Sequence, residues 1–340
     1  MKTRSLKKIS VVLGALLALV LTLGLSSAPA ADKITIKLTT VQMPKQQMGK
    51  GAQQLATIVK KELGEKVEIK VYPSAQLYGG KEEIEALMRG EIEMCFPIGS
   101  QLENVDPALQ LFKLPFIFPS AHVAYKVLDS DIGTALMKKV LDRNILSLGI
   151  FTSGNVLFAN SKRPLLMPED FKGLKMRSFG RMGKDTLQAL GATAVVTASE
   201  ETFSALQQGV IDGMSTPNSV YLLRKYNTVQ KYVTDGGMVN FTNGYLLANA
   251  KFWNGLPGDV RTPLKAIIDK VIADMRKEMD EENIKINERI KKTGNELFIL
   301  TPEQVAAWEK ALQVVYTKYG PEIGEDMIKK VQDRVKELSR

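Results

Sequence analysis

The sequence predicts a protein of two α/β domains that face each other across a cleft. Strand and helix patterns alternate along the chain, which favours sheets covered by helices. A helix–glycine–strand unit occurs twice, at 82–93 and at 200–212, so we expect two domains of similar build. About 310 residues follow an N-terminal leader, which is more than one typical hydrophobic core accommodates.

The leader, residues 1–30, has the pattern of a secretory signal peptide. It begins with four basic residues, continues with an apolar stretch over 11–25 and ends in a small-x-small cleavage site at 28–30. We therefore expect cleavage after about Ala30 and a mature protein in the periplasm. No cysteine lies near the cleavage site, so no lipid anchor is expected.

The first domain is predicted to contain strands over 34–39, 67–71, 92–98 and 145–151. A helix with one apolar face lies between the first two strands and ends at Gly64. A second helix, over 81–89, ends at Gly90. The small polar residues at 152–155 are typical of both a hinge and a cleft wall, so we place the first crossing between domains there.

The second domain is predicted to contain strands over 174–177 and 193–197, and 241–250 is the expected return crossing. A long helix begins with Thr262 as its cap and continues to Gly294. A capping box at 301–304 begins a further helix. The expected division is a signal peptide over 1–30, lobe I over 31–152 plus 243–282, and lobe II over 153–242 plus 283–340.

Composition excludes several function classes. The single histidine, His122, and the single cysteine, Cys95, provide neither a catalytic pair nor an internal disulfide. Phosphate-binding and dinucleotide-binding glycine motifs are absent, and the usual zinc ligands are missing. We expect no cofactor, no metal and no catalytic residue, although an ion that bridges a ligand stays open.

The formal charge is +9, and removing the four basic residues of the leader leaves 42 − 37 = +5. This balance suits anionic ligands, but a generally basic surface explains it equally well. No basic block interleaved with aromatic residues argues for nucleic acid.

Arg177 is the principal candidate binding residue. It ends an alternating strand in which Leu174 and Met176 are expected to point inward, and a glycine-bearing turn follows it. A guanidinium in that position presents a planar fork of donors to a carboxylate. Taken alone, such an arginine would more often form an ordinary surface ion pair.

Several ordered segments accompany Arg177: Val71-Tyr-Pro-Ser-x-Gln-Leu77, Leu114-Pro-Phe116, Asn160-Ser-Lys-Arg-Pro164, Gly173-Leu-Lys-Met-Arg177, Ala205-Leu-Gln-x-Gly-Val-Ile-Asp-Gly213, Val229-Gln-Lys-Tyr232 and Phe252-Trp-x-x-Leu-Pro257. Together they resemble the solute-binding proteins of tripartite ATP-independent periplasmic (TRAP) transporters. The resemblance implies a two-lobed periplasmic binding protein fold with a long helix spanning both domains. It also implies that Arg177 binds a substrate carboxylate, and that the closed form docks on a small and a large membrane permease subunit.

The expected substrate-binding set comprises Arg177, Asn155, Thr216, Asn218, Ser100, Phe179, Gln42, Tyr78 and Tyr245. The chain departs from the family at Val156, where many members have a second arginine, and at 214–217. We therefore expect a small organic acid with one obligatory carboxylate and a less charged remainder. Lys175, Arg181 or Lys184 could replace the missing cation, which keeps a dicarboxylate possible.

Two alternatives remain at this stage. One is a secreted hydrolase that uses only carboxylates, and the other is an ABC-type binding protein. A hydrolase would more often place aromatic platforms beside paired acids, whereas aromatic residues make up 7% of this chain. We expect a monomer without catalytic turnover.

Overall fold

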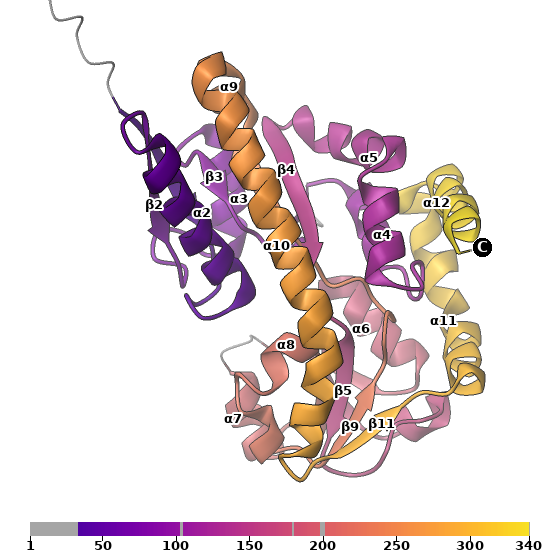
Figure 1. Ribbon diagram of the computed structural model, residues 1–340. Coiled ribbons are helices and arrows are strands. Elements are labelled where there is room, and N and C mark those ends of the chain that lie inside the picture. The colour runs from indigo at the N-terminus through magenta and orange to yellow at the C-terminus, as the bar shows by residue number, and fades with distance from the viewer. Residues whose placement is uncertain (1–32, 103–104, 179, 198–200, 340) are drawn as a thin grey trace, which may run out of the picture. The chain divides into compact units, whose positions relative to one another are not determined.

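The computed structural model describes residues 33–339 except 103–104, 179 and 198–200 (Figure 1). Its strands form two separate mixed sheets, one of five strands and one of six. The predicted α/β class with two sheets is therefore confirmed. No helix within the described ranges is long and apolar enough to cross a membrane.

The first sheet has the strand order β2-β1-β3-β10-β4. Its strands are β1 (Ile34–Thr39), β2 (Val67–Tyr72), β3 (Met94–Cys95), β4 (Ile145–Thr152) and β10 (Asn243–Asn249). Strand β3 is parallel to β1, whereas β10 is antiparallel to both β3 and β4. The helices of this part of the chain are α2 (Gln47–Leu63), α3 (Gly80–Arg89), α4 (Ala121–Leu128), α5 (Asp131–Leu141) and α9 (Ala250–Gly255).

Strand β3 is shorter than the predicted strand over 92–98. Pro97 has no backbone N–H to donate to a neighbouring strand, and the chain turns at Gly99 into the 3₁₀ helix η1 (Gly99–Leu102). A second 3₁₀ helix, η2 (Pro107–Lys113), follows before α4. Asp106 caps it, because its side chain accepts a hydrogen bond from the backbone N–H of Ala108.

The second sheet has the strand order β11-β9-β5-β8-β6-β7. Its strands are β5 (Val156–Asn160), β6 (Lys175–Ser178), β7 (Thr193–Val196), β8 (Gly213–Pro217), β9 (Tyr232–Asp235) and β11 (Glu296–Ile299). Strand β6 is parallel to both of its neighbours, β7 and β8, whereas β5 is antiparallel to β8 and β9. The helical segments that accompany the second sheet are η3 (Pro168–Phe171), α6 (Gly180–Ala189), α7 (Thr202–Gln207), α8 (Asn218–Tyr221) and η4 (Tyr226–Thr228).

The chain passes from β4 of the first sheet to β5 of the second at 153–155, and it returns between β9 and β10. Helix α10 (Gly258–Lys291) packs against α2 and β4 and also against α8 and β11, so it contacts elements of both sheets (Figure 1). It begins at Gly258 rather than at Thr262, and Pro263 consequently lies inside the helix instead of in its first turn.

Helix α11 (Pro302–Ile323) begins with the predicted capping box. Gln304 Oε1 accepts from the Thr301 N–H at 2.9 Å, and Thr301 Oγ1 accepts from the Gln304 N–H at 3.4 Å. This helix packs against η2 and α6, whereas α12 (Glu325–Leu338) packs against α4. The C-terminal helices thus contact elements that accompany both sheets, and the division of the chain into lobes I and II stays a prediction.

An aromatic cluster fixes α11 to the second sheet. The rings of Phe158, Phe171 and Trp308 meet edge to face, with centroids 5.1–5.7 Å apart. Trp308 is fully buried, and its indole Nε1 donates to the carbonyl of Leu166 at 2.9 Å. The cluster therefore combines apolar burial with a satisfied polar group.

Candidate functional site

A cavity of about 280 Å³ is lined by segments of both sheets and their connecting loops. Small-molecule sites usually have volumes of about 300–1,000 Å³, so this cavity suits a small ligand. Its walls include the loop after β1, η1, the end of η2, β6, β8, the segment after α8, and the segment that leads into β10.

Arg177 lies in this cavity, near the end of β6. The predicted alternation holds, because Met176 is fully buried and Lys175 is exposed. The Arg177 side chain is nevertheless only 6% exposed, and its Nε donates to the backbone carbonyl of Thr197 at 3.2 Å. This hydrogen bond restricts the orientation of the guanidinium. Because Arg177 lies on a strand rather than on a loop, its position in the cavity wall is also well defined.

Three other residues of the expected set line the same cavity: Gln42, Ser100 and Thr216. The Gln42 side-chain oxygen accepts from the backbone N–H of Met48 at 2.9 Å, which orients its amide at the start of α2. Thr216 lies on β8 and is buried, and Ser100 lies in η1. The structure therefore brings four of the expected residues together from elements far apart in sequence.

Asn155 and Asn218 are not among the described residues that line the cavity. They hold the first chain crossing against α10 instead. The backbone N–H of Asn218 donates to the carbonyl of Asn155 at 2.8 Å, and its side-chain amide donates to Asn283 Oδ1 at 2.7 Å. Asn283 Oδ1 also accepts from the Asn155 N–H at 3.3 Å.

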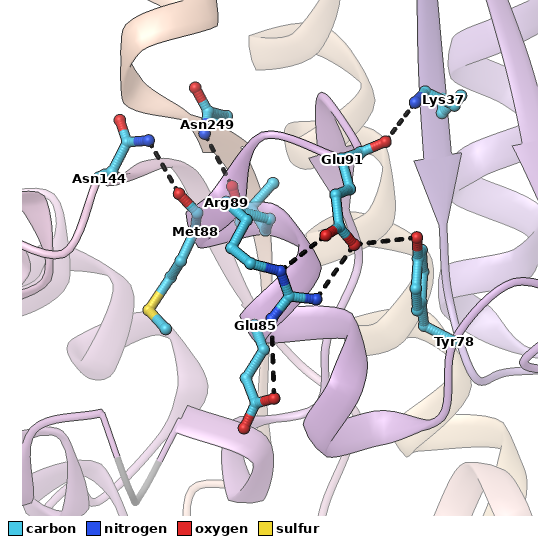
Figure 2. Close-up of polar contacts among 9 residues, drawn as sticks. Lys37, Tyr78, Glu85, Met88, Arg89, Glu91, Asn144 and Asn249 are labelled. Atoms are coloured by element: carbon cyan, nitrogen blue, oxygen red, sulfur yellow. Dashed lines mark hydrogen bonds and ion pairs between the residues drawn. The ribbon is translucent and has the colours of Figure 1, made fainter.

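The aromatic members of the expected set lie elsewhere. Figure 2 shows Tyr78 directed at Glu91, whose carboxylate accepts from the tyrosine hydroxyl at 3.1 Å and also pairs with Arg89. Tyr245 is buried, and its hydroxyl accepts from the Asn243 side-chain amide at 2.6 Å behind the cavity wall. Phe179 lies outside the described residues.

Two further cations, Lys113 and Arg224, also line the cavity, and the sequence analysis did not select them. Lys113 is the last residue of η2, directly before the Leu114-Pro115-Phe116 segment, and that adjacency was the signal that could have identified it. Burial lowers the pKa of the Lys113 ammonium to about 7.

Lys175, Arg181 and Lys184, the possible replacements for the missing arginine, are not among the described residues that line the cavity. Lys175 and Lys184 are exposed, and Arg181 forms an ion pair with Glu322. Among the described residues, the cationic groups that line the cavity are therefore Lys113, Arg177 and Arg224.

The polar character of the cavity suits an organic anion. Its described lining contains these three basic side chains and no carboxylate, together with amides such as those of Gln42, Gln46 and Asn240. Apolar side chains, among them Phe241 and Val220, form the rest of the wall. Within the described ranges, no group of histidine, cysteine or acidic residues could hold a metal ion.

The fold has two sheets joined by two chain crossings, and a long helix contacts both sheets. With a cationic cavity lined by elements of both sheets, this is the arrangement of the class of periplasmic binding proteins. Residues 38–322 match the model of bacterial extracellular solute-binding protein family 7, and the chain belongs to that family. The family is one of extracellular proteins, which agrees with the predicted export, while cleavage after Ala30 stays a prediction.

Curated relatives agree with this assignment. The C4-dicarboxylate-binding periplasmic protein DctP of Rhodobacter capsulatus is 36% identical over 333 residues, covering 94% of this chain and 97% of that protein. The protein of the same name from Shewanella loihica is 30% identical, with coverage of 90% and 91%.

Solved structures also match. A TRAP solute-binding protein of Sulfurospirillum deleyianum with bound succinate is 36% identical with a TM-score of 0.79, and the match covers 88% of this chain and 98% of that one. Another from Pseudomonas aeruginosa, with bound L-malate, is 29% identical with a TM-score of 0.77 and coverage of 84% and 100%. These relatives are solute-binding proteins of transporters, so solute binding is supported over a secreted hydrolase or an ABC-type binding protein.

Proposed function

We propose that this chain is the periplasmic solute-binding subunit of a TRAP transporter, and that it captures a C4-dicarboxylate or a closely related organic acid. It then delivers the ligand to a permease made of a small and a large membrane subunit. The observation that carries this proposal is the placement of Arg177, with Lys113 and Arg224, in a cavity that elements of both sheets line. The names and bound ligands of the relatives, which include succinate and L-malate, support the choice of ligand class.

In the proposed complex, Arg177 binds one ligand carboxylate through two parallel N–H···O bonds. Ser100 and Thr216 add hydroxyl donors, and Gln42 adds an amide. Exclusion of water by the surrounding wall strengthens the ion pair, because the effective dielectric constant falls. The residues from both sheets then act on one ligand, and its binding favours closure of lobes I and II over the cavity.

The lining of the cavity also changes the expectation that the ligand has one obligatory carboxylate and is less charged elsewhere. That expectation rested on the missing second arginine at Val156 and on the departure at 214–217, with Lys175, Arg181 or Lys184 as possible replacements. Lys113 and Arg224 line the cavity together with Arg177, so a second carboxylate would meet positive charge. A dicarboxylate is therefore the first compound class to test.

The test is a thermal-shift screen of purified mature protein against organic acids, followed by isothermal titration calorimetry with the acids that raise the melting temperature. We expect succinate or L-malate to bind. Arg177→Ala should then cost about 3–5 kcal/mol of binding free energy, because it leaves a buried carboxylate unpaired. That cost is roughly two to four decades in Kd. Arg177→Lys keeps the charge but loses the planar fork, so it should also weaken binding.

Arg143→Ala, in the exposed turn that follows α5, is the matched control and should bind as the unmutated protein does. The sequence alone suggested that Arg177 faces a wet cleft and contributes little to the stability of the empty protein. Because Arg177 is 6% exposed and hydrogen bonded to Thr197, we now expect Arg177→Ala to lower the melting temperature as well. Binding is therefore compared at a temperature where both variants are folded. Unchanged affinity, or chemical conversion of the bound acid, would contradict the proposal.

Lobe closure and the monomeric state are tested separately. Small-angle X-ray scattering should record a smaller radius of gyration when succinate is added, since closure brings the two lobes together. Size-exclusion chromatography with light scattering should give the mass of one chain with and without the ligand. A ligand-independent radius of gyration would argue against closure, and a dimeric mass would argue against the monomer.

A further inference from the structure

A second cavity, also of about 280 Å³, lies beside the cavity that contains Arg177. The two cavities adjoin, because they share four lining residues, which we call the partition: Gln42, Gln46, Ser153 and Val220. The rest of the described lining of the second cavity comes from the loop before α2 and the first turn of that helix, from α8 and the segment that follows it, and from the part of α10 between 278 and 289. The partition therefore separates two cavities of similar size.

The first chain crossing holds the elements on both sides of the partition. Gln47 Nε2 donates to the carbonyl of Thr152 at 2.8 Å, and this hydrogen bond fixes the start of α2. Ser219 Oγ donates to the carbonyl of Ser153 at 2.8 Å, and this hydrogen bond fixes α8. Two consecutive carbonyls of the crossing thus position two elements that are far apart in sequence.

Gln46 and Val220 are the direct sequence neighbours of these two anchored residues. The Gln46 side chain is 7% exposed, and its Oε1 accepts from the backbone N–H of Met43 at 2.8 Å, which restricts its orientation. Val220 is followed by the fully buried Tyr221, so a shift of α8 would also disturb a large core side chain. The partition is therefore a fixed wall rather than a pair of mobile side chains.

The chemistry of the second cavity suits the continuation of an organic acid. Its described lining includes four apolar side chains: Leu222, Leu223, Met279 and Ile286. It also includes three basic and two acidic residues: Lys45, Lys50, Arg289, Glu278 and Glu282. Glu278 pairs with Lys50 at 2.9 Å. Glu282 pairs with Arg289, so both acids are neutralised and the net charge of this lining is positive. A methylene chain would find apolar contacts there, and a terminal carboxylate would meet positive charge.

We propose that the partition sets the length of the acid that this chain binds, and that Gln46 and Val220 are the residues that exclude a longer one. This inference rests on the proposed function and specifies its selectivity. An acid of four carbons bound by Arg177 occupies the first cavity alone, whereas an acid of six carbons would have to cross the partition. Removing the two side chains joins the cavities and admits the longer acid.

The experiment compares succinate, glutarate and adipate, which have a carboxylate at each end and contain four, five and six carbons. Isothermal titration calorimetry with the purified mature protein gives a Kd for each acid. One methylene that a pocket does not accommodate changes affinity by about 10- to 200-fold. We therefore expect the unmutated protein to bind adipate at least about tenfold more weakly than succinate.

The double substitution Gln46→Ala with Val220→Ala, the open variant, removes the partition. It should lower the ratio of the adipate Kd to the succinate Kd by about tenfold or more. Val220→Ala alone keeps the hydrogen bond between Gln46 and Met43, so it tests the inference even if the open variant is unstable, and it should change the ratio in the same direction by less. The matched control is Gln53→Ala with Val210→Ala, at exposed positions that are not among the described residues lining either cavity, and it should leave the ratio unchanged.

A change of charge locates the far end of the longer acid. Lys45 lines the second cavity and is not among the described residues that line the first. Adding Lys45→Gln to the open variant should weaken the binding of adipate more than that of succinate, by the modest amount expected for an exposed ion pair. Equal weakening of both acids would show that adipate does not extend into the second cavity, and the inference would be wrong.

The remaining outcomes distinguish this inference from the proposed function. An unchanged ratio in both the open variant and Val220→Ala would overturn the inference, because the partition would not be what excludes the longer acid. Equal affinity of the unmutated protein for all three acids would also overturn it, while capture of an organic acid stands. If no organic acid binds at all, the proposed function fails and the inference with it.

Discussion

Glu83 offers a stability test of the region that supports the cavity. It lies in the first turn of α3 with no exposed surface, and its Oε2 is 3.3 Å from the Gln101 amide nitrogen. Gln101 also accepts from the N–H of Ile98 at 2.7 Å, so it fixes the start of η1, where Ser100 lines the cavity. Burial raises the pKa of the Glu83 carboxyl to about 7, although a hydrogen bond from the Gln101 amide opposes the shift. The substitution Glu83→Gln keeps the shape and removes the charge.

The size and sign of the effect follow from the pKa. The difference between the usual 4.5 and about 7 corresponds to an upper value of about 3 kcal/mol, at about 1.4 kcal/mol per pH unit. Because the folded state binds this proton more tightly, stability is greatest below about pH 4.5, falls as the pH rises towards 7 and is constant above it. Glu83→Gln lacks this loss, so it should be more stable than the unmutated protein at pH 8, by up to about 3 kcal/mol, and similar to it at pH 4.5.

The assay is urea unfolding at several pH values between 4.5 and 8, with and without the substitution. Glu82→Gln is the matched control, because Glu82 is exposed in the same helical turn, and we expect a change of less than about 1 kcal/mol. The reasoning is refuted if Glu83→Gln is less stable at pH 8, or if both proteins lose stability equally between pH 4.5 and 7.

Three further substitutions, with Gly173→Ala as a control for the first, test the fold by urea unfolding. Gly154→Ala should lower the free energy of unfolding by about 1–3 kcal/mol or more, because Gly154 has φ of 103° and an added Cβ would lie 2.1 Å from Asn218 Oδ1. Gly173→Ala should lower it less, because Gly173 has φ of 77° but open space around an added Cβ. Trp308→Ala should cost about 3–5 kcal/mol, since it removes the centre of the aromatic cluster. Thr301→Ala should cost about 0.5–2 kcal/mol through the lost helix cap, and a loss below 0.3 kcal/mol would contradict that role.

Local sequence patterns predicted the elements whose formation depends on neighbouring residues. The alternation at 174–177 correctly placed Met176 in the core and Arg177 on the opposite face. The helix that ends at Gly64 and the capping box at Thr301 were also correct, because the spacing of apolar residues and the cap chemistry determine them locally. Strand 92–98 was predicted too long, since an apolar run does not reveal how a proline limits pairing.

The composition of the cavity could not be derived in the same way. Lys113 and Arg224 reach it from segments more than 100 residues apart in sequence, and periodicity says nothing about which loops meet. Tyr78 illustrates the converse, because its hydroxyl is directed at Glu91 by a network of exposed charges that no local pattern encodes (Figure 2). The asparagines at 155 and 218 suited a cleft wall by residue type, but their amides and backbone hold the crossing to Asn283.

The location of Val156 explains why a second cation would have to come from elsewhere in this chain. Val156 is 1% exposed on β5, pairs with Pro217 of β8, and belongs to the apolar core. A charged side chain confined to that core would incur a desolvation cost unless it reached a partner. Among the described residues, the positive charge of the cavity comes instead from Lys113, Arg177 and Arg224, none of which lies on β5.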